Sequence, residues 1–250
     1  LDMAGVSLSL VWLDEVIEPL WLAACDTPAY RRRAASQVDL DTTPLSQKAE
    51  QVMVANPGSP ASQDVADVIV KALDEVAMRL SERSSELGRL DSVAGDGDHG
   101  IGMARGSQAA LAEARRVREE GAGAATTLNA AGSAWSEHAG GTSGALWGAA
   151  LTAFGAVLGD EDPVGDDAIR QAAGAALNAV TRLGGAKIGD KTMVDAMAPF
   201  VTTLESSSNR LPQAWDSACR AAGAAAQATS EVIAKVGRAR PLGEKSLGTP

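Results

Sequence analysis

The stretch DVADVIVKALDEVAMRL, residues 64–80, carries apolar residues at the spacing of an amphipathic helix. The positions that follow the i, i+3, i+4, i+7 pattern are Val65, Val68, Ile69, Ala72, Leu73, Val76 and Leu80. Asp64, directly in front of them, is a residue type suited to an N-cap. We therefore predict a helix from Asp64 to about residue 87, with this apolar face in a core.

The same helical pattern recurs along the rest of the chain, and we find no strand pattern that interrupts it. Further helices are predicted at residues 103–120, 124–139, 143–159, 166–183, 191–206 and 212–236. Only 3% of the residues are aromatic, and small side chains let helices approach closely. We predict an all-α fold, an antiparallel bundle or helical barrel.

The N-terminal part of the chain has a different character. Residues 6–13 alternate between apolar and polar side chains, as in a short β-strand. Because a lone strand is not stable in water, we expect residues 1–34 to be the end of an upstream α/β domain, in a piece of a longer protein. Residues 35–62 are rich in Pro, Ser and Gln and read as a linker, and residues 63–250 form the helical domain.

The charge of the chain disfavours two classes of partner. The net charge is −10 and the pI is about 4.7, so the surface repels nucleic acid and anionic membranes. Asp14, Glu15 and Glu18 interrupt the apolar start, which excludes a membrane span there. The two cysteines, Cys25 and Cys219, lie far apart and are expected to be reduced thiols of a cytoplasmic protein.

Three glycine-rich turns, at residues 88–100, 139–143 and 184–190, each follow one up-and-down pair of predicted helices. In such an arrangement alternate loops share one end, so we expect these turns at the same rim, where they would form a pocket.

The first of these turns is acidic. Asp91, Asp96 and Asp98 lie within eight residues and repel one another unless a cation or solvent compensates them. The glycines between them allow positive φ and let the carboxylates converge. Oxygen-only ligands suit a hard ion, and a small number of carboxylates favours Mg²⁺, with room for water and phosphate oxygens.

Two other interpretations of the acidic turn exist. An EF-hand is disfavoured, because the twelfth position from Asp96 is Ser107 and not Glu. The turn is also compatible with plain helix capping, in which Asp98 stabilises the dipole of the next helix. Asp98 is able to serve both purposes.

The remaining polar residues of the turns give weaker signals. His99 either contacts a ligand or orients a carboxylate, and His138 is better explained as a cap of its own helix. GGTSG, residues 140–144, offers backbone N–H groups at a helix start, a general anion site. GGAKIGDKT, residues 184–192, does not fit a phosphate-binding P-loop in spacing or context, although Lys187 and Lys191 are able to neutralise phosphate.

Taken together, these segments resemble the nucleotide-binding domain of the dihydroxyacetone kinase family. The similar segments are LDSVAGDGDHGIGM at 90–103, GGTSGALWG at 140–148, GDKTMVDAM at 189–197 and GRARPLGEKSLGTP at 237–250. Residues 1–33 resemble the end of the substrate-binding domain of that family. The resemblance implies an eight-helix barrel with the nucleotide at one end.

The resemblance also implies the site residues. Asp91, Asp96 and Asp98 would bind a pair of Mg²⁺ ions that bridge the phosphates of ATP or ADP. The residues that would line the nucleotide are His99, Gly100, Ile101, Gly102, Thr142, Ser143, Gly184, Thr192, Met193 and Arg238. A histidine that links the ketone substrate covalently would lie outside this chain, so no catalytic residue is assigned.

The implied activity is the ATP-dependent phosphorylation of dihydroxyacetone or a related short ketose such as erythrulose, in glycerol metabolism. This chain would supply the Mg-ATP site, would be inactive alone, and would belong to a homodimer in the full-length protein. The alternative is an ADP-holding subunit that serves as a phosphoryl carrier or regulator. A fatty-acid kinase is a third interpretation, disfavoured by the N-terminal segment.

Overall fold

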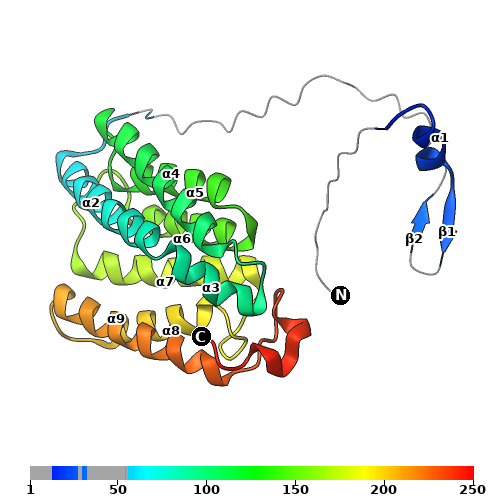
Figure 1. The fold of residues 1–250 in the computed structure, drawn as a ribbon. Helices are drawn as coiled ribbons and strands as arrows, with labels where there is room; N and C mark the ends of the chain where they lie inside the picture. The colour runs from blue at the N-terminus through cyan, green and yellow to red at the C-terminus, as the bar shows by residue number, and fades with distance from the viewer. Residues whose placement is uncertain (1–12, 28–29, 33–53, 55) are drawn as a thin grey trace. The chain divides into compact units, whose positions relative to one another are not determined.

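The structure is a computed structural model that describes residues 13–27, 30–32, 54 and 56–250 (Figure 1). The chain divides into two compact units, residues 1–50 and residues 51–250.

The N-terminal unit contains a short helix, α1 (Ile17–Leu22), and the strands β1 (Cys25–Thr27) and β2 (Tyr30–Arg32). The strands form an antiparallel pair in which Cys25 lies opposite Arg32. The predicted strand at residues 6–13 falls almost wholly outside the described residues, and Leu13 itself is not in a strand. Apolar side chains of α1 are exposed, Leu20 to 74%, and this helix contains no buried residue.

The described residues of the second unit form eight α-helices, which confirms the predicted all-α fold (Figure 1). The helices are α2 (Pro60–Glu82), α3 (Ser84–Ala94), α4 (His99–Glu119), α5 (Ala124–Ala139), α6 (Gly141–Leu158), α7 (Asp166–Gly184), α8 (Met193–Ser206) and α9 (Leu211–Ala228). From α4 onward, each helix packs against the next one in the sequence, and α2 packs against α4 and α5. Antiparallel neighbours joined by short loops follow from this order.

The start of α2 is one turn earlier than predicted. Ser59 is the N-cap, and its hydroxyl accepts a hydrogen bond from the Ser62 N–H at 3.1 Å. Pro60 occupies the first helical position, where the missing N–H carries no penalty. The prediction from Asp64 was wrong because the polar composition before it resembles that of a linker.

The buried face of α2 is also rotated from the predicted one. Ala66, Leu73 and Ala77 are buried, whereas Val68 is 63% exposed. The small alanines take the core positions because neighbouring helices approach closely there, and the larger valine lies outside.

The predicted helix from residue 64 to 87 is two helices. The chain breaks at Arg83 (φ −98°, ψ 5°), and α3 then runs to Ala94. Serines at positions 81, 84 and 85 favour such a break, because their hydroxyls compete for backbone groups. In consequence Asp91 lies on the last turn of a helix and not in a loop, and α4 begins at His99, before the predicted residue 103.

The end of the chain is less helical than predicted. The helix α9 ends at Ala228, and two short 3₁₀ helices follow, η1 (Thr229–Glu231) and η2 (Arg240–Ser246). The predicted continuation to residue 236 was wrong, because the Ala-rich run ends at Thr229 and β-branched residues follow.

Small residues bring α5 and α6 into close contact, as the composition predicts. A Cβ atom at Gly132 would lie only 2.6 Å from the Gly148 carbonyl oxygen, so any side chain there would separate the two helices. Within the described residues, α6 is the one helix that is long and apolar enough to cross a membrane by length and composition. It packs against both α5 and α7 within the bundle.

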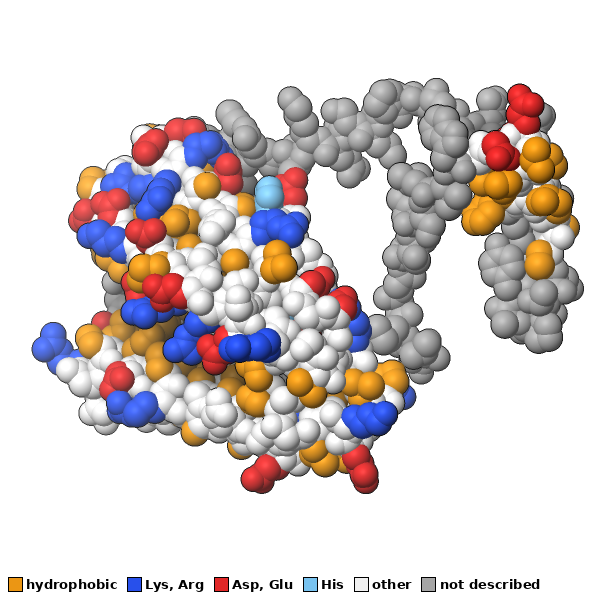
Figure 2. Space-filling view, viewed as in Figure 1, with side chains coloured by type: hydrophobic (Ala, Val, Ile, Leu, Met, Phe, Trp, Pro, Cys, Tyr) orange, Lys and Arg blue, Asp and Glu red, His pale blue; other side chains and the backbone are white. Residues whose placement is uncertain are grey.

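Charged side chains of both signs are spread over the face that α2 and α4 form (Figure 2). Two ion pairs join these helices, Arg118 with Asp67 at 2.7 Å and Arg115 with Asp74 at 3.0 Å. The Arg118 guanidinium holds the pKa of the Asp67 carboxyl below its usual value. The net negative charge of the chain is therefore not gathered on this face.

The three glycine-rich turns lie at one end of the bundle, as the helix order predicts. A Cβ atom at Gly102, in the first turn of α4, would lie 2.6 Å from the Ala139 carbonyl oxygen at the end of α5. Leu146, near the start of α6, contacts the position of Gly184 at the end of α7. The rim therefore runs from the α3–α4 turn past the α5–α6 turn to the loop between α7 and α8.

Candidate functional site

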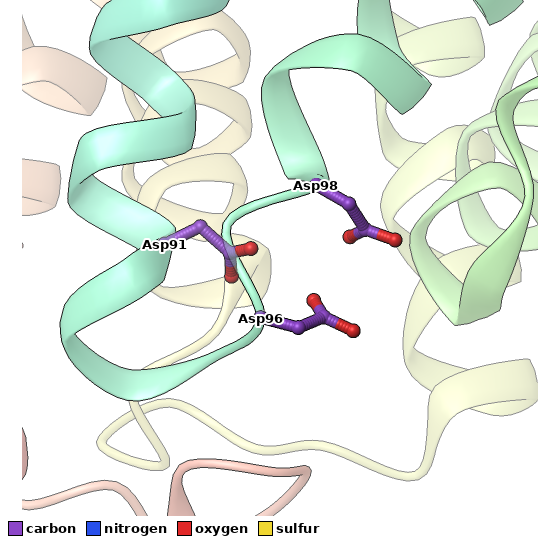
Figure 3. Close-up of side chains that lie close together, drawn as sticks. All are labelled: Asp91, Asp96 and Asp98. Atoms are coloured by element: carbon purple, nitrogen blue, oxygen red, sulfur yellow. The ribbon is translucent and has the colours of Figure 1, made fainter.

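Three carboxylates converge at the α3–α4 turn. Asp91 projects from the last turn of α3, Asp96 from the turn itself and Asp98 from the position before α4. One oxygen atom of each can be chosen so that all three lie within 4.8 Å of one another. The three side chains point toward a common space beside the turn (Figure 3). The predicted cluster is therefore assembled, with Asp91 half-buried and the other two exposed.

The backbone of the turn folds around Asp91. Its Oδ2 atom accepts hydrogen bonds from the N–H groups of Gly97, at 2.8 Å, and His99, at 3.3 Å. Gly97 has φ of +80°, a conformation that glycine adopts without strain. A Cβ atom at Gly95 would lie 2.3 Å from Asp91 Oδ1, so only glycine leaves that carboxylate in place.

Asp91, and not Asp98, caps the start of α4. Asp98 occupies the N-cap position of α4, but its side chain makes no capping hydrogen bond. Asp91 takes that role through its bond from the His99 N–H. The Asp98 carboxylate is thus not needed to cap α4.

Arg238 is the cation that faces this cluster. It forms an ion pair with Asp96, from the segment between η1 and η2. The Arg238 hydrogen bond holds the pKa of the Asp96 carboxyl below its ordinary value. The pKa of Arg238 is raised, first by its hydrogen bond to Asp96 and also by the charges of Asp98 and Asp91. One guanidinium against three carboxylates leaves the cluster with an excess of negative charge.

This donor set fits magnesium. Three carboxylates supply hard oxygen ligands, and their exposed side leaves room for water and phosphate oxygens, which Mg²⁺ usually retains. The close approach of Gly95 to Asp91 and the bonds to Gly97 and His99 orient one ligand before any ion binds. Hydrogen bonds that orient a ligand in this way increase the affinity of a site for its metal ion.

The first turn of α4 gives its glycines a packing role. A Cβ atom at Gly100 would lie 1.9 Å from the Ser84 carbonyl oxygen, so α4 begins in direct contact with α3. Gly102 contacts the end of α5 in the same way. Ile101, between them, is exposed, and His99 is half-buried. His138, in contrast, directs Nδ1 to the Ala134 carbonyl at 3.0 Å, a contact within its own helix.

The start of α6 lies next along the rim. Gly140 and Gly141 both have positive φ, of 70° and 62°, and turn the chain sharply from α5 into α6. Thr142 and Ser143 follow in the first helical turn, Thr142 exposed and Ser143 half-buried. The N–H groups of a first turn have no acceptor within their own helix, which suits an anion.

The loop between α7 and α8 holds the remaining predicted residues. Gly184 ends α7, Thr192 is the N-cap of α8, and Met193 is its first residue. The Thr192 hydroxyl accepts from the Val194 N–H at 3.2 Å, and Asp195 accepts from the Thr192 N–H at 2.7 Å. Met193 packs partly into the core.

Sequence reasoning missed two residues that shape this loop. Asp195 is 8% exposed, and besides Thr192 it accepts a hydrogen bond from the Gly189 N–H at 2.5 Å. The pattern Thr192-x-x-Asp195 is a capping box, and this signal was available in the sequence. Lys191, considered above as a phosphate contact, instead directs its ammonium group to backbone carbonyls of the C-terminal segment.

A groove of about 690 Å³ lies elsewhere, between α5, α6 and α7. Its lining is mostly Gly, Ala, Ser and Thr, with Arg182 and Leu183 at the end of α7. It contains none of the predicted site residues, so the acidic turn is a separate feature of the surface.

Comparison with known proteins agrees with this picture. Residues 93–250 match the DAK2 domain. The chain is 48% identical over 251 residues to L-erythrulose 1-kinase of Mycolicibacterium smegmatis, a match that covers 100% of this chain and 44% of that protein. It is also 31% identical over 184 residues to the ADP-binding subunit DhaL of PEP-dependent dihydroxyacetone kinase 1 of Listeria innocua, covering 73% of this chain and 86% of that subunit.

A solved structure is similar in fold. The crystal structure of the dihydroxyacetone kinase from C. freundii in complex with AMP-PNP and Mg²⁺ matches with a TM-score of 0.51 and 26% sequence identity. The match covers 86% of this chain and 37% of that one. The chain therefore spans less than half the length of the erythrulose kinase and of this dihydroxyacetone kinase.

Proposed function

Because the chain belongs to the dihydroxyacetone kinase family through its DAK2 domain, we propose that it supplies the Mg-ATP site of an ATP-dependent kinase of short ketoses. The substrate class is dihydroxyacetone or a related ketose such as erythrulose. The similarity to an erythrulose kinase along the whole of this chain supports this class.

The observation that carries the proposal is the convergence of Asp91, Asp96 and Asp98 within 4.8 Å. These residues would hold two magnesium ions between the protein and the nucleotide phosphates. Bound magnesium supplies charge neutralisation for the transferred phosphoryl group. An acidic protein needs such a device, because its own charge repels a triphosphate.

The surrounding rim would bind the rest of the nucleotide. The first turns of α4 and α6, with His99, Thr142 and Ser143, would offer backbone N–H groups and polar side chains to the nucleotide. Arg238 would contribute a positive charge on the other side of Asp96. Gly100, Ile101 and Gly102, and Gly184, Thr192 and Met193 further along the rim, complete the proposed nucleotide site.

The chemistry needs positioning and no nucleophile from this chain. A ketose hydroxyl attacks the γ-phosphorus in line and loses its proton to water, while the bond between the γ-phosphorus and the bridging oxygen breaks and ADP leaves with the electron pair of that bond. In this proposal residues 1–34 end a ketose-binding domain and residues 35–62 link it to the nucleotide domain at 63–250, although the last three residues of that linker, from Pro60, already form the first turn of α2. The ketose-linking histidine lies outside the chain. The chain alone would bind nucleotide without phosphorylating ketose, and the full-length protein would be a cytoplasmic homodimer.

A second candidate function is that of an ADP-holding subunit in a phosphoryl relay. The similarity to the Listeria ADP-binding subunit supports it, since that match covers most of the subunit. The identity is lower, however, 31% against 48%, and the match leaves out about a quarter of this chain, which the erythrulose kinase matches in full.

The test is a turnover assay of the full-length protein with Mg²⁺, ATP, and either dihydroxyacetone or L-erythrulose. A kinase forms one ADP per ketose phosphate over many turnovers, without another protein. If ketose phosphate forms only after a phosphoryl-donor protein is added, and the bound ADP does not exchange, the second function is correct and the first is not.

A further inference from the structure

Lys191 has an unusual backbone conformation. Its φ is +62°, and it is the one non-glycine residue with positive φ in the part of the chain that the structure describes. A side chain in this left-handed region is strained, and such strain persists only where the surroundings hold the residue. The side chain of Lys191 therefore needs strong partners.

Four backbone carbonyl groups surround the Lys191 ammonium group. Lys191 Nζ lies 2.5 Å from the Ser246 carbonyl oxygen, 2.6 Å from that of Thr249, 3.0 Å from that of Thr229 and 3.2 Å from that of Val232. An ammonium group has three protons, so these four acceptors take all of them. Partial burial lowers the pKa of Lys191, which agrees with a group removed from water. Lys191 thus has no proton left for a phosphate.

The segment that these carbonyls belong to has few apolar contacts of its own. Thr229, Ala234 and Ser246 are its buried members. The Ser246 hydroxyl joins Gly243 to the Ala234 N–H, and the Gly248 N–H donates to the Ser230 carbonyl at 2.9 Å. Polar ties therefore hold residues 229–249 together, and Lys191 lies where the two ends of this segment meet.

The same segment carries the arginine of the site. Arg238 extends from it to Asp96 in the acidic turn. A second tie, from the Lys235 N–H to the Asp190 carbonyl at 3.2 Å, fixes the segment to the loop before α8. Lys191 and its neighbour Asp190 thus attach this segment to the rim on both sides of Arg238.

We propose that Lys191 is a positioning residue of the nucleotide site, which fastens residues 229–249 to the rim and so holds Arg238 beside the acidic turn without touching the ligand. The inference rests on the proposed function for the identity of the ligand. Lys187, in the same loop, is exposed and lacks such ties to the C-terminal segment among the described contacts.

The first experiment compares Lys191→Met with Lys245→Met in the full 250-residue chain. Lys245 is an exposed lysine of the same C-terminal segment, so its substitution removes the same charge without the carbonyl contacts. Without nucleotide, hydrogen exchange of the Ala234, Lys235 and Gly248 amides should accelerate at least about tenfold in Lys191→Met only, with the amides of α4 to α6 unchanged. Affinity for AMP-PNP with Mg²⁺ should fall about tenfold in the same variant.

A second variant separates the ammonium from the strained backbone. Lys191→Gly relieves the strain at φ +62° and leaves a carbonyl-lined space. Butylammonium chloride, which replaces the missing side chain, should restore amide protection and nucleotide affinity to this variant. Sodium chloride at the same ionic strength should not.

The outcomes are distinct. Nucleotide affinity within twofold of the parent chain in Lys191→Met, or full affinity in Lys191→Gly without amine, overturns the inference and leaves the proposed function intact. If the parent chain binds no Mg-nucleotide, the proposed function fails, while amide exchange still reports the fastening by itself. If both variants fail to fold, Mg²⁺ with AMP-PNP must increase protection of Ala234 and Gly248 in the parent chain, and unchanged protection overturns the inference.

Discussion

Two loops at the same rim use the same residue types in opposite ways. In the α3–α4 turn, Asp96 and Asp98 are exposed and point into a shared space, and Arg238 is the cation that faces them (Figure 3). In the loop before α8, both oxygens of Asp195 accept backbone N–H groups, and the charge of Lys191 is enclosed by carbonyls.

The partners of the polar side chains in these two loops distinguish residues available to a ligand from residues that stabilise the fold. Glycine and aspartate occur in both loops, and a cation lies close to each, so residue type does not distinguish them. What distinguishes them is whether the polar groups find partners inside the protein. In the second loop Asp195 and Lys191 find their partners inside the protein, whereas the first loop leaves oxygen atoms available to a metal ion.

The largest effect should come from Asp98→Asn in the acidic turn. The change removes one ligand charge but no capping bond, so affinity for Mg-AMP-PNP should fall at least about 100-fold, as judged from losses on perturbing metal sites. Isothermal titration of the parent chain and the variant measures it, with circular dichroism as a check on folding. Asp162→Asn, an exposed acid in the α6–α7 loop, is the control and should bind normally. Unchanged affinity in Asp98→Asn would remove the metal assignment.

The matching substitution in the other loop, Asp195→Asn, should act on stability. Asp195 is buried, and an amide nitrogen in place of one oxygen would face a backbone N–H and leave it unpaired. The free energy of unfolding should drop by about 2 kcal/mol. Urea denaturation measures this change. A variant as stable as the parent chain would show that the loop is not held by this carboxylate.

Two glycine substitutions sharpen the comparison further. Gly95→Ala introduces a Cβ atom 2.3 Å from Asp91 Oδ1, at φ of −142°, so it displaces a ligand without backbone strain. Mg²⁺ affinity should fall about tenfold, the usual cost of disturbing a ligand's orientation. Gly185→Ala has the opposite properties. The backbone there has φ of +67°, which strains any side chain, but an added Cβ atom would contact nothing. It should cost about 1 kcal/mol of stability and leave Mg²⁺ affinity unchanged.

The smallest effect concerns the Arg118–Asp67 pair, which has no place in the site. Arg118 lowers the pKa of Asp67 from its ordinary value of 3.8, so the pair stabilises the fold above that value. This contribution is lost as the pH falls through the lowered pKa of Asp67. Arg118→Met should melt slightly below the parent chain at neutral pH, because exposed pairs contribute little. Thermal melts should show this difference shrinking below pH 3.8, and a difference that widens there contradicts the assigned pair.

The helices were predictable where local pattern and packing agree. Residues 124–139 were predicted as a helix and form one with those bounds, because a glycine precedes the run and a glycine follows it. The break at Arg83 was not predictable from periodicity, since α3 continues the helical pattern of α2 in a new direction. The buried face of α2 was misjudged because alanine, and not valine, fits where helices lie close.

The candidate site was predictable as far as it is local. Asp91, Asp96 and Asp98 lie close in sequence, so their convergence follows from the turn. The roles of Lys191 and Arg238 depend on partners 38 to 58 and 142 residues away along the chain, and no local pattern indicates such contacts. Asp195 was predictable in part. The capping-box pattern is visible in the sequence, but the burial of the side chain is not.

The most direct test of the central claim is a crystal structure of this chain with Mg²⁺ and AMP-PNP. We expect metal ions bound by oxygen atoms of Asp91, Asp96 and Asp98 and bridged to the nucleotide phosphates at the rim. Carboxylates that face bulk solvent, with the nucleotide bound at another part of the surface, would contradict it.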